Sequence, residues 1–196
     1  DAVKRYVPDT RWIQTPRASR PGMSRRLFVS VDLDGLGSEV ERVQRPLADA
    51  SGLTLTDPEQ AHITLKFLGD TDADRIPDVS EALEDAVGES DVSPFTVEFG
   101  GFGVFPHLDY ISVVWLGVRS GNDKLRRLQE AVEAKTVAVG FDPRDNDFTP
   151  HVTLARMSHA GAKERVQSVV ENRDPDAGSL TVEEIRLTES RLTESG

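Results

Sequence analysis

Hydrophobic and polar residues alternate in several short stretches of this chain and recur every three to four positions in others. Alternation with a period of two is typical of strands with one buried face, and the longer period is typical of amphipathic helices. The alternating stretches predict strands over residues 26–33, 53–56, 62–69, 95–99, 111–118, 148–157 and 179–187. The helical period predicts helices over residues 36–50, 76–87, 122–139 and 162–170.

Strand and helix patterns follow one another along the chain, with pairs of adjacent strands in between. This order predicts an α+β fold. No linker rich in Gly, Ser or Pro divides residues 23–196, so we expect one domain there. Residues 1–22 contain three prolines and four arginines but no apolar segment of the signal-peptide kind. We expect these residues to be a disordered extension or a start-site artefact outside the fold.

Composition excludes several classes of protein. No apolar run approaches the roughly 20 residues that span a bilayer, so we expect a soluble protein without a membrane partner. The chain has no cysteine, which excludes disulfides and thiolate metal sites and favours a cytoplasmic location. We expect a monomer.

The charge of the chain is unusual for a protein that binds nucleic acid. The net charge is −11, with 19 Asp and five Lys, whereas phosphate attraction is normally supplied by a basic face. Two interpretations remain open at this point. Either the acidic surface is a halophilic adaptation, in which concentrated salt screens the repulsion and local arginines decide binding, or the protein does not bind nucleic acid.

A short repeat carries most of the functional information. His62-Ile-Thr-Leu65 recurs 89 positions later as His151-Val-Thr-Leu154, each time within a predicted strand. Side chains at i and i+2 share one face of a strand, so each copy presents an imidazole and a hydroxyl on the same face. The chain has four histidines, and chance is a poor explanation for two of them in matched motifs. The other two, His107 and His159, have no such pattern, and we expect them at the surface.

Two imidazoles and two hydroxyls suit chemistry at phosphorus. Histidine titrates near pH 6.5, so near neutrality His62 and His151 can serve as one acid and one base. The base deprotonates water and the acid protonates the departing oxygen, while Thr64 and Thr153 hydrogen-bond the phosphoryl oxygens. A metal site is the rival use of two histidines, but no third ligand stands at a suitable spacing. We therefore expect no metal and no cofactor.

These segments resemble a known family. Residues 62–69 (His-Ile-Thr-Leu-Lys-Phe-Leu-Gly) and 148–156 (Phe-Thr-Pro-His-Val-Thr-Leu-Ala-Arg) are similar to the paired signatures of the two-histidine phosphoesterase superfamily. More narrowly, they resemble its RNA 2′,3′-cyclic phosphodiesterases, also called 2′-5′ RNA ligases. The similarity extends to residues 26–32, 101–106, 114–118 and 187–192. It implies a bilobal, pseudo-two-fold duplication in which antiparallel sheets line a central cleft, with helices outside.

The resemblance also implies roles for single residues. His62 would donate a proton to the leaving O3′, and His151 would accept one from water, which gives an RNA 2′-phosphate. The substrates would be RNAs with 2′,3′-cyclic phosphate ends, tRNA halves among them, and 2′-5′ ligation would be the reverse reaction. Arg156 matches a family arginine that contacts the phosphate. Strict alternation turns Arg156 away from His151, so the strand must end or bulge near Ala155.

Some expectations stay open. Lys66 shares the parity of His62 and either adds positive potential to the cleft mouth or is a solvated lysine at the strand end. Phe148 either stacks on a base or packs in the core, which we favour. Two alternative functions also remain. The same site could act on small cyclic nucleotides or an ADP-ribose cyclic phosphate, or the protein could be a non-catalytic module that binds RNA or a nucleotide.

Overall fold

The computed structural model describes residues 24–190, and the expected extension over residues 1–22 lies outside these described residues. The described part contains four α-helices: α1 (Gly37–Gln44), α2 (Ile76–Glu89), α3 (Asn122–Ala138) and α4 (Lys163–Asn172). It contains eight strands: β1 (Ser24–Asp32), β2 (Leu53–Leu55), β3 (His62–Asp72), β4 (Phe95–His107), β5 (Tyr110–Ser120), β6 (His151–Met157), β7 (Asp176–Val182) and β8 (Arg186–Glu189). Short 3₁₀ helices cover Arg45–Leu47, Pro58–Gln60, Ala73–Arg75 and Ala160–Ala162.

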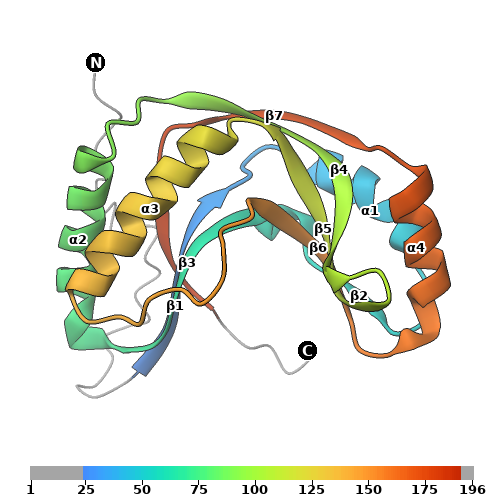
Figure 1. Ribbon diagram of the computed structural model, residues 1–196, viewed down its shortest axis with the longest axis horizontal. Helices are drawn as coiled ribbons and strands as arrows, with labels where there is room; N and C mark the ends of the chain where they lie inside the picture. The colour runs from blue at the N-terminus through green and yellow to red at the C-terminus, as the bar shows by residue number, and fades with distance from the viewer. Residues whose placement is uncertain (1–23, 191–196) are drawn as a thin grey trace.

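All eight strands belong to one antiparallel sheet. The order along it is β7-β4-β5-β6-β3-β1-β8, and β2 pairs with β6. The sheet is curled into a half-barrel (Figure 1), and the helices lie outside it, with α2 and α3 at one end and α1 and α4 at the other. Fully buried aliphatic side chains from the strands and the helices form a shared core between these layers. The predicted α+β fold is confirmed.

The two pseudo-symmetric halves that the family resemblance implied are joined through one pair of strands. Strand β3 carries the first His-Thr motif and β6 carries the second, and the two strands pair antiparallel through Ile63 and Val152. These residues occupy the same position in the two motifs. The sheets of the two halves therefore join into one curled sheet at its centre, where both motif strands lie (Figure 1).

Several predicted elements differ from the structure: the strand predicted over residues 95–99 continues to His107, and the one predicted over residues 148–157 begins at His151. The stretch 179–187 forms two strands, β7 and β8, which lie at opposite ends of the strand order and are joined by three residues. The curl of the sheet makes so short a connection possible. The helix predicted over residues 36–50 ends at Gln44 and continues as a 3₁₀ turn to Leu47, because Pro46 cannot donate a backbone hydrogen bond to the preceding turn.

Candidate active site

Both motifs present their polar residues on one face of the sheet. Ile63, Leu65, Val152 and Leu154 are fully buried towards the helices. Alternation along each strand therefore turns the histidines and threonines to the opposite side, where they are half-buried. We call this side of the sheet the histidine face; it is defined by His62, Thr64, His151 and Thr153.

The pairing of the two motif strands brings their polar residues together. Ile63 pairs with Val152 in an antiparallel register. One position away on either side of this pair, the register places His62 opposite Thr153 and Thr64 opposite His151. Opposite residues of an antiparallel pair have Cα atoms about 4.5–5.5 Å apart. Each imidazole therefore lies near the hydroxyl of the other motif, and the charge of His62 acts on the pKa of His151.

The two histidine rings are held in the same way. Nδ1 of His62 lies 2.8 Å from the carbonyl oxygen of Gln60, and Nδ1 of His151 lies 2.7 Å from that of Thr149. A carbonyl oxygen can only accept, so this hydrogen-bond network assigns a proton to Nδ1 in both rings and leaves Nε2 as the unprotonated nitrogen of a neutral ring. Neither Nε2 nor the hydroxyls of the two motif threonines bond to any residue between 24 and 190.

The surroundings of His151 favour its neutral form. Its ring packs against Phe105, with centroids 4.9 Å apart, and against Trp115 at 5.9 Å. Burial lowers the pKa of His151 below its ordinary value, and the positive charges of Arg144, His62 and Arg156 lower it further. The hydrogen bond to Thr149 opposes this shift without cancelling it. A neutral imidazole with an unprotonated Nε2 is the form that a general base needs.

A β-bulge interrupts each motif strand at the same position. Leu65 has no partner on β1, where the register passes from Ser30–Thr64 to Val29–Lys66. Leu154 likewise has no partner on β5, where it passes from Trp115–Thr153 to Val114–Ala155. Each bulged residue lies three positions after its histidine. Beyond it the alternation is shifted by one residue, so side chains that would have faced the helices point to the histidine face instead.

The bulge in β3 overturns the expected position of Lys66. Lys66 is only 4% exposed and lies on the buried side, where its Nζ is 3.0 Å from Oε1 of Glu133 and donates to the carbonyl oxygen of Asp142 at 2.6 Å. It therefore neither lies at a cleft mouth nor is solvated. The parity argument was wrong because it ignored the extra residue at Leu65. Lys66 instead ties α3 to the loop that leads into β6.

The same bulge exposes an aromatic residue that the sequence reasoning missed. Phe67 takes the place on the histidine face that Lys66 was expected to fill, and it is 71% exposed. Its ring lies 6.3 Å from that of Phe28, whose ring lies 5.0 Å from His62. The only sequence signal was the position of Phe67, five residues after His62, which matches that of Arg156 after His151.

Positive charge gathers near His151. The bulge at Leu154 is the irregularity that Arg156 required, and the register places the exposed Arg156 on the histidine face beside Val113 of β5. Arg144, in the loop before β6, also acts on the pKa of His151. Sequence reasoning missed Arg144, because nothing in an irregular loop fixes the direction of a side chain.

Acidic groups near His62 are partly neutralised by one arginine. Asp32 pairs with His62 across β1 and β3. Its carboxylate accepts a hydrogen bond of 2.8 Å from Arg186 of β8, which also contacts Asp34 and Glu184. This arginine offsets part of the negative potential that the three carboxylates produce on this side of the histidine face.

The remaining candidates have other surroundings. Phe148 is 6% exposed and packs in the core, as we favoured, with Arg144 over its ring at 5.4 Å. His107 and His159 are exposed, as expected. His159 also has a local role, because its Nδ1 accepts a hydrogen bond from the backbone of Gly161 at the start of the last 3₁₀ helix.

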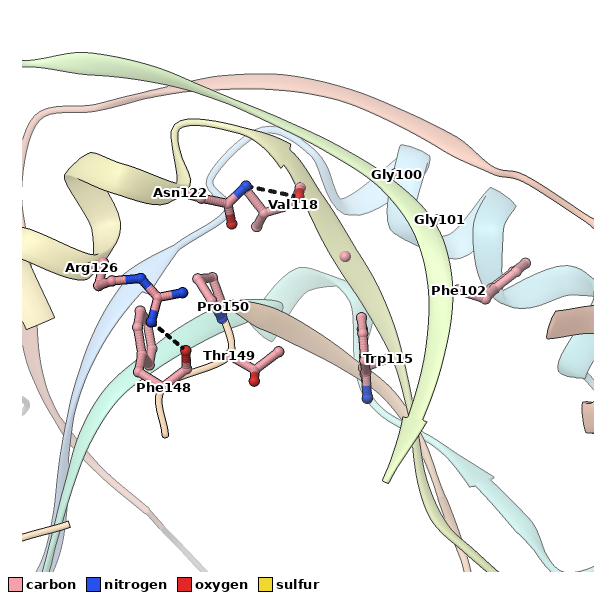
Figure 2. A pocket seen from close by; sticks show the side chains of 11 residues that line it. Gly100, Gly101, Phe102, Trp115, Val118, Asn122, Arg126, Phe148, Thr149 and Pro150 are labelled. Atoms are coloured by element: carbon pink, nitrogen blue, oxygen red, sulfur yellow. Dashed lines mark hydrogen bonds between the residues drawn. The ribbon is translucent and has the colours of Figure 1, made fainter. Parts of the chain in front are cut away.

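A cavity of about 350 Å³ is lined in part by Thr149 and Pro150, the two residues that precede His151 in the chain (Figure 2). Its walls come from β4, β5, the first turn of α3 and the segment that leads into β6. Phe148 and Pro150 form apolar parts of the lining, and Asn122 and Arg126 bring polar groups to it. Trp115 lines the side next to His151, and its indole N–H is buried without a partner among residues 24–190.

Two further observations concern metals and membranes. Over residues 24–190, no group of three or more His, Cys, Asp or Glu side chains is placed to hold a metal ion. None of the described helices has the length and apolar character that a membrane crossing requires.

Comparison with known proteins places the chain in a family. Residues 33–194 match the 2′-5′ RNA ligase superfamily. The chain is 34% identical over 177 residues to an RNA 2′,3′-cyclic phosphodiesterase of Methanothermobacter thermautotrophicus, covering 89% of this chain and 94% of that protein. It is 39% identical over 143 residues to one of Aeropyrum pernix, covering 70% and 77%. Its fold is similar to that of TT0787 of Thermus thermophilus, with a TM-score of 0.69, 26% identity and coverage of 87% and 91%. The chain therefore belongs to the 2′-5′ RNA ligase superfamily.

Proposed function

We propose that this protein hydrolyses RNA 2′,3′-cyclic phosphate ends to 2′-phosphates. One observation carries the proposal. Two imidazoles at equivalent positions of two paired strands, each with Nε2 unengaged by residues 24–190, share a face with two similarly unengaged hydroxyls. The names of the relatives support the same activity, since those compared above are RNA 2′,3′-cyclic phosphodiesterases.

His151 acts as the general base. Its lowered pKa keeps the ring neutral near pH 7, and its Nδ1–H bond to Thr149 directs the Nε2 lone pair to the histidine face. Nε2 takes a proton from water as the water oxygen bonds to phosphorus. The nearby arginines make the ring a weaker base, but they also draw the anionic phosphodiester to it.

His62 acts as the general acid on the other side. With Nδ1–H bonded to Gln60, a protonated ring presents Nε2–H to O3′. The P–O3′ bond breaks and O3′ takes this proton, so the product is a 2′-phosphate with a free 3′-hydroxyl. Exchange with solvent then returns His62 to its protonated form and His151 to its neutral form. In-line displacement places the entering and leaving oxygens on opposite sides of phosphorus, as two histidines in opposed strands allow.

The non-bridging oxygens need donors while negative charge develops on them. The hydroxyls of Thr64 and Thr153 lie between the two histidines in the register of the motif strands. Arg156 adds a positive charge on the same face. Groups fixed before the reaction stabilise developing charge without the cost of reorganising solvent. The two hydroxyls and Arg156 also allow a protein of net charge −11 to bind an anion, because these nearby groups attract the phosphate.

The ribose that carries the cyclic phosphate lies on the side of His62, since its O3′ is the leaving group. Phe67 is the exposed aromatic ring on that side. A nucleobase stacks on such a ring with little dependence on sequence. We assign Phe67 to the base of the terminal nucleotide. The 2′-5′ joining of RNA ends would open the same cyclic phosphate at the same site, with a 5′-hydroxyl in place of water as the nucleophile.

Product analysis tests this function. An oligonucleotide with a 2′,3′-cyclic phosphate end is incubated with the protein, and the product is separated by chromatography from 2′- and 3′-phosphate standards. We expect the 2′-phosphate alone. A 3′-phosphate would mean that the P–O2′ bond broke, which contradicts the role of His62. Binding without turnover would identify a non-catalytic module.

A further inference from the structure

Two polar side chains hold the β-bulge of β6 from the edge opposite β5. The bulge lies at Leu154, where β6 stops pairing with β3 and begins to pair with β2. Thr56, which directly follows β2, and Gln44, the last residue of α1, both reach this point. Gln44 is only 3% exposed. We call Gln44 and Thr56 the bulge clamp.

Both clamp residues bond to the backbone of the bulge. The Thr56 hydroxyl donates to the carbonyl oxygen of Thr153 at 2.8 Å, and the Thr56 backbone N–H donates to that of Leu154 at 2.9 Å. The Gln44 amide nitrogen donates to the carbonyl oxygen of Leu154 at 2.9 Å and to that of Thr56 at 2.8 Å. Carbonyl oxygens can only accept, so these contacts assign the amide nitrogen of Gln44, and not its oxygen, to the bulge.

The clamp supplies hydrogen bonds that the ladder with β5 does not. Leu154 is the extra residue of the bulge and has no partner on β5. A buried carbonyl outside a ladder needs other donors, because leaving it unpaired costs free energy. Leu154 is fully buried, and its carbonyl accepts from both clamp residues. The clamp therefore stabilises the bulge.

The direction of Arg156 depends on this bulge. Arg156 lies five residues after His151, and strict alternation would turn it to the helix side. The extra residue at Leu154 brings it back to the histidine face. Thr54 of β2 pairs with Arg156, so the segment that ends in Thr56 runs beside β6 from the bulge to this arginine.

The pKa of His151 depends on where the Arg156 guanidinium lies. Burial is the main cause of the lowered pKa of His151, and the positive charge of Arg156 adds to it. The interaction between two charges weakens with distance. A guanidinium that moves away from the imidazole therefore raises this pKa, and the change can be measured without substrate.

We propose that Gln44 and Thr56 are positioning residues that fix Arg156 against the reacting phosphate. The inference rests on the proposed function, in which Arg156 stabilises the charge that develops on the phosphoryl oxygens. The clamp acts through two backbone carbonyls of β6 and not on the substrate itself. A displacement of about 1 Å near the reacting atoms can cost about 100-fold in rate, so a looser bulge slows the reaction although every group of the site is still present.

Thr56→Val tests the clamp, because it removes the hydroxyl and keeps the shape of the side chain. We expect kcat/KM for a cyclic-phosphate-ended oligonucleotide to fall about tenfold, whereas Thr56→Ser, which keeps the hydroxyl, should stay within about twofold of the wild type. In an Arg156→Ala background, Thr56→Val should cost about twofold or less, since the group that it positions is already absent. A full tenfold effect in that background would overturn the proposal.

The second readout is the pKa of His151, measured by NMR titration of its ring in the free protein. Thr56→Val should raise this pKa, as Arg156→Ala does, because a positive charge has moved away. The two changes together should raise it no further than Arg156→Ala alone. An unchanged pKa in Thr56→Val would mean that the guanidinium has stayed in place, and would also overturn the proposal.

A loss of stability alone gives a different result. Thr136→Val is the matched control, since Thr136 is fully buried in α3 and its hydroxyl donates to the carbonyl oxygen of Val132 at 2.8 Å. It should lower stability in urea unfolding as Thr56→Val does, without changing kcat/KM or the pKa of His151. Gln44→Met, which removes the donors of the other clamp residue, should act in the same direction as Thr56→Val in both readouts. Equal effects of Thr136→Val and Thr56→Val on kcat/KM would show that stability, and not positioning, is responsible.

The two readouts separate this proposal from the function on which it rests. Failure of the wild-type protein to hydrolyse cyclic ends, together with a raised pKa of His151 in Thr56→Val, would remove the proposed function and leave the placement of Arg156 by the clamp. Hydrolysis by the wild type, without coupling between Thr56 and Arg156 in either readout, would remove the clamp alone.

Discussion

Ile63 and Val152 pair across the junction of β3 and β6, and each directly follows the histidine of its own motif. Both side chains are fully buried on the helix side, so the core fixes this junction. Two equivalent residues that pair in an antiparallel ladder lie on the local two-fold axis relating their strands. His62 and His151 therefore approach this axis from opposite directions, which is the arrangement that the proposed acid and base on opposite sides of one phosphorus require.

Replacing either histidine should remove most of the activity. We expect His62→Ala and His151→Ala each to lower kcat at least about 100-fold, the usual result of losing a general acid or base. Both side chains are half-buried on the histidine face, so thermal unfolding should stay near that of the wild type. His107→Ala is the control, since His107 is exposed at the β4–β5 turn. Turnover near the wild-type rate in either variant would exclude the acid–base mechanism.

The pH profile should report the base. His151 must be neutral to act, and its pKa is lowered below 6.5, so the acid limb of kcat/KM should fall below pH 6.5. Arg144→Gln removes a positive charge that lowers this pKa. The limb should therefore move to higher pH, on the order of a few tenths of a unit for a charge acting through water. Arg127→Gln, with the same change in net charge, should leave it in place. A shift to lower pH in Arg144→Gln would reverse the assignment.

Chelators should leave the activity unchanged. In the proposed reaction, the phosphoryl oxygens are stabilised by two hydroxyls and Arg156, and water is activated by an imidazole, so no step needs a metal ion. We expect the hydrolysis rate to be the same after dialysis against EDTA as before. Activity that EDTA abolishes and added zinc or magnesium restores would show that the two histidines serve as metal ligands.

The fold could be predicted from sequence where local pattern decides it. Helix α3 follows its hydrophobic period closely, because it buries one regular face, and β3 follows its alternation from His62 as far as the bulge at Leu65. The break between β7 and β8 could not be read, since residues 179–187 form a continuous pattern of strand type. Their separation depends on which strands they pair with, β4 for one and β1 for the other, and pairing partners are a property of the whole sheet.

The same distinction, between local pattern and strand pairing, explains which site residues could be predicted. His62 and His151 are evident in the sequence because the motif occurs twice. Lys66 was misplaced because the bulge at Leu65 arises from the register with β1, which β3 alone does not specify. The bulge in β6 was expected near Ala155 and lies one residue earlier, at Leu154. The cavity at Arg126 was not foreseen, since α3 and the segment before β6 meet only in the folded chain.

Lys66 should matter for stability. Its ammonium group is buried against Glu133 and the Asp142 carbonyl, and removing one partner leaves the other charge with little solvent. We expect Lys66→Met to lower the free energy of unfolding by about 2–3 kcal/mol, below the full cost of a broken buried pair because Glu133 is partly exposed. Urea unfolding measures this. Lys135→Met, at the more exposed pair with Glu89, should have a much smaller effect. A higher KM with unchanged stability in Lys66→Met would instead make Lys66 a substrate ligand.

Phe67 should act on substrate binding with little effect on the fold. Its ring is exposed on the histidine face and contacts Phe28, so Phe67→Ala removes little buried area. Stacking of one base on an aromatic ring is worth about 1–3 kcal/mol, so we expect KM for a cyclic-ended oligonucleotide to rise about tenfold or more, with kcat changed less. Phe67→Trp should restore binding, because the larger ring keeps the stacking surface.

The control for Phe67 is Tyr110→Ala, which removes another exposed aromatic ring. Tyr110 lies at the start of β5, where it pairs with His107 of β4 and not with β1 or β3. This variant should leave KM unchanged. A cyclic-phosphate-ended abasic oligonucleotide completes the test, because it has no base to stack. Phe67→Ala should then have the same KM as the wild type. If Phe67→Ala weakened binding of the abasic substrate as strongly as that of the complete one, Phe67 would support the phosphate site and would not bind the base.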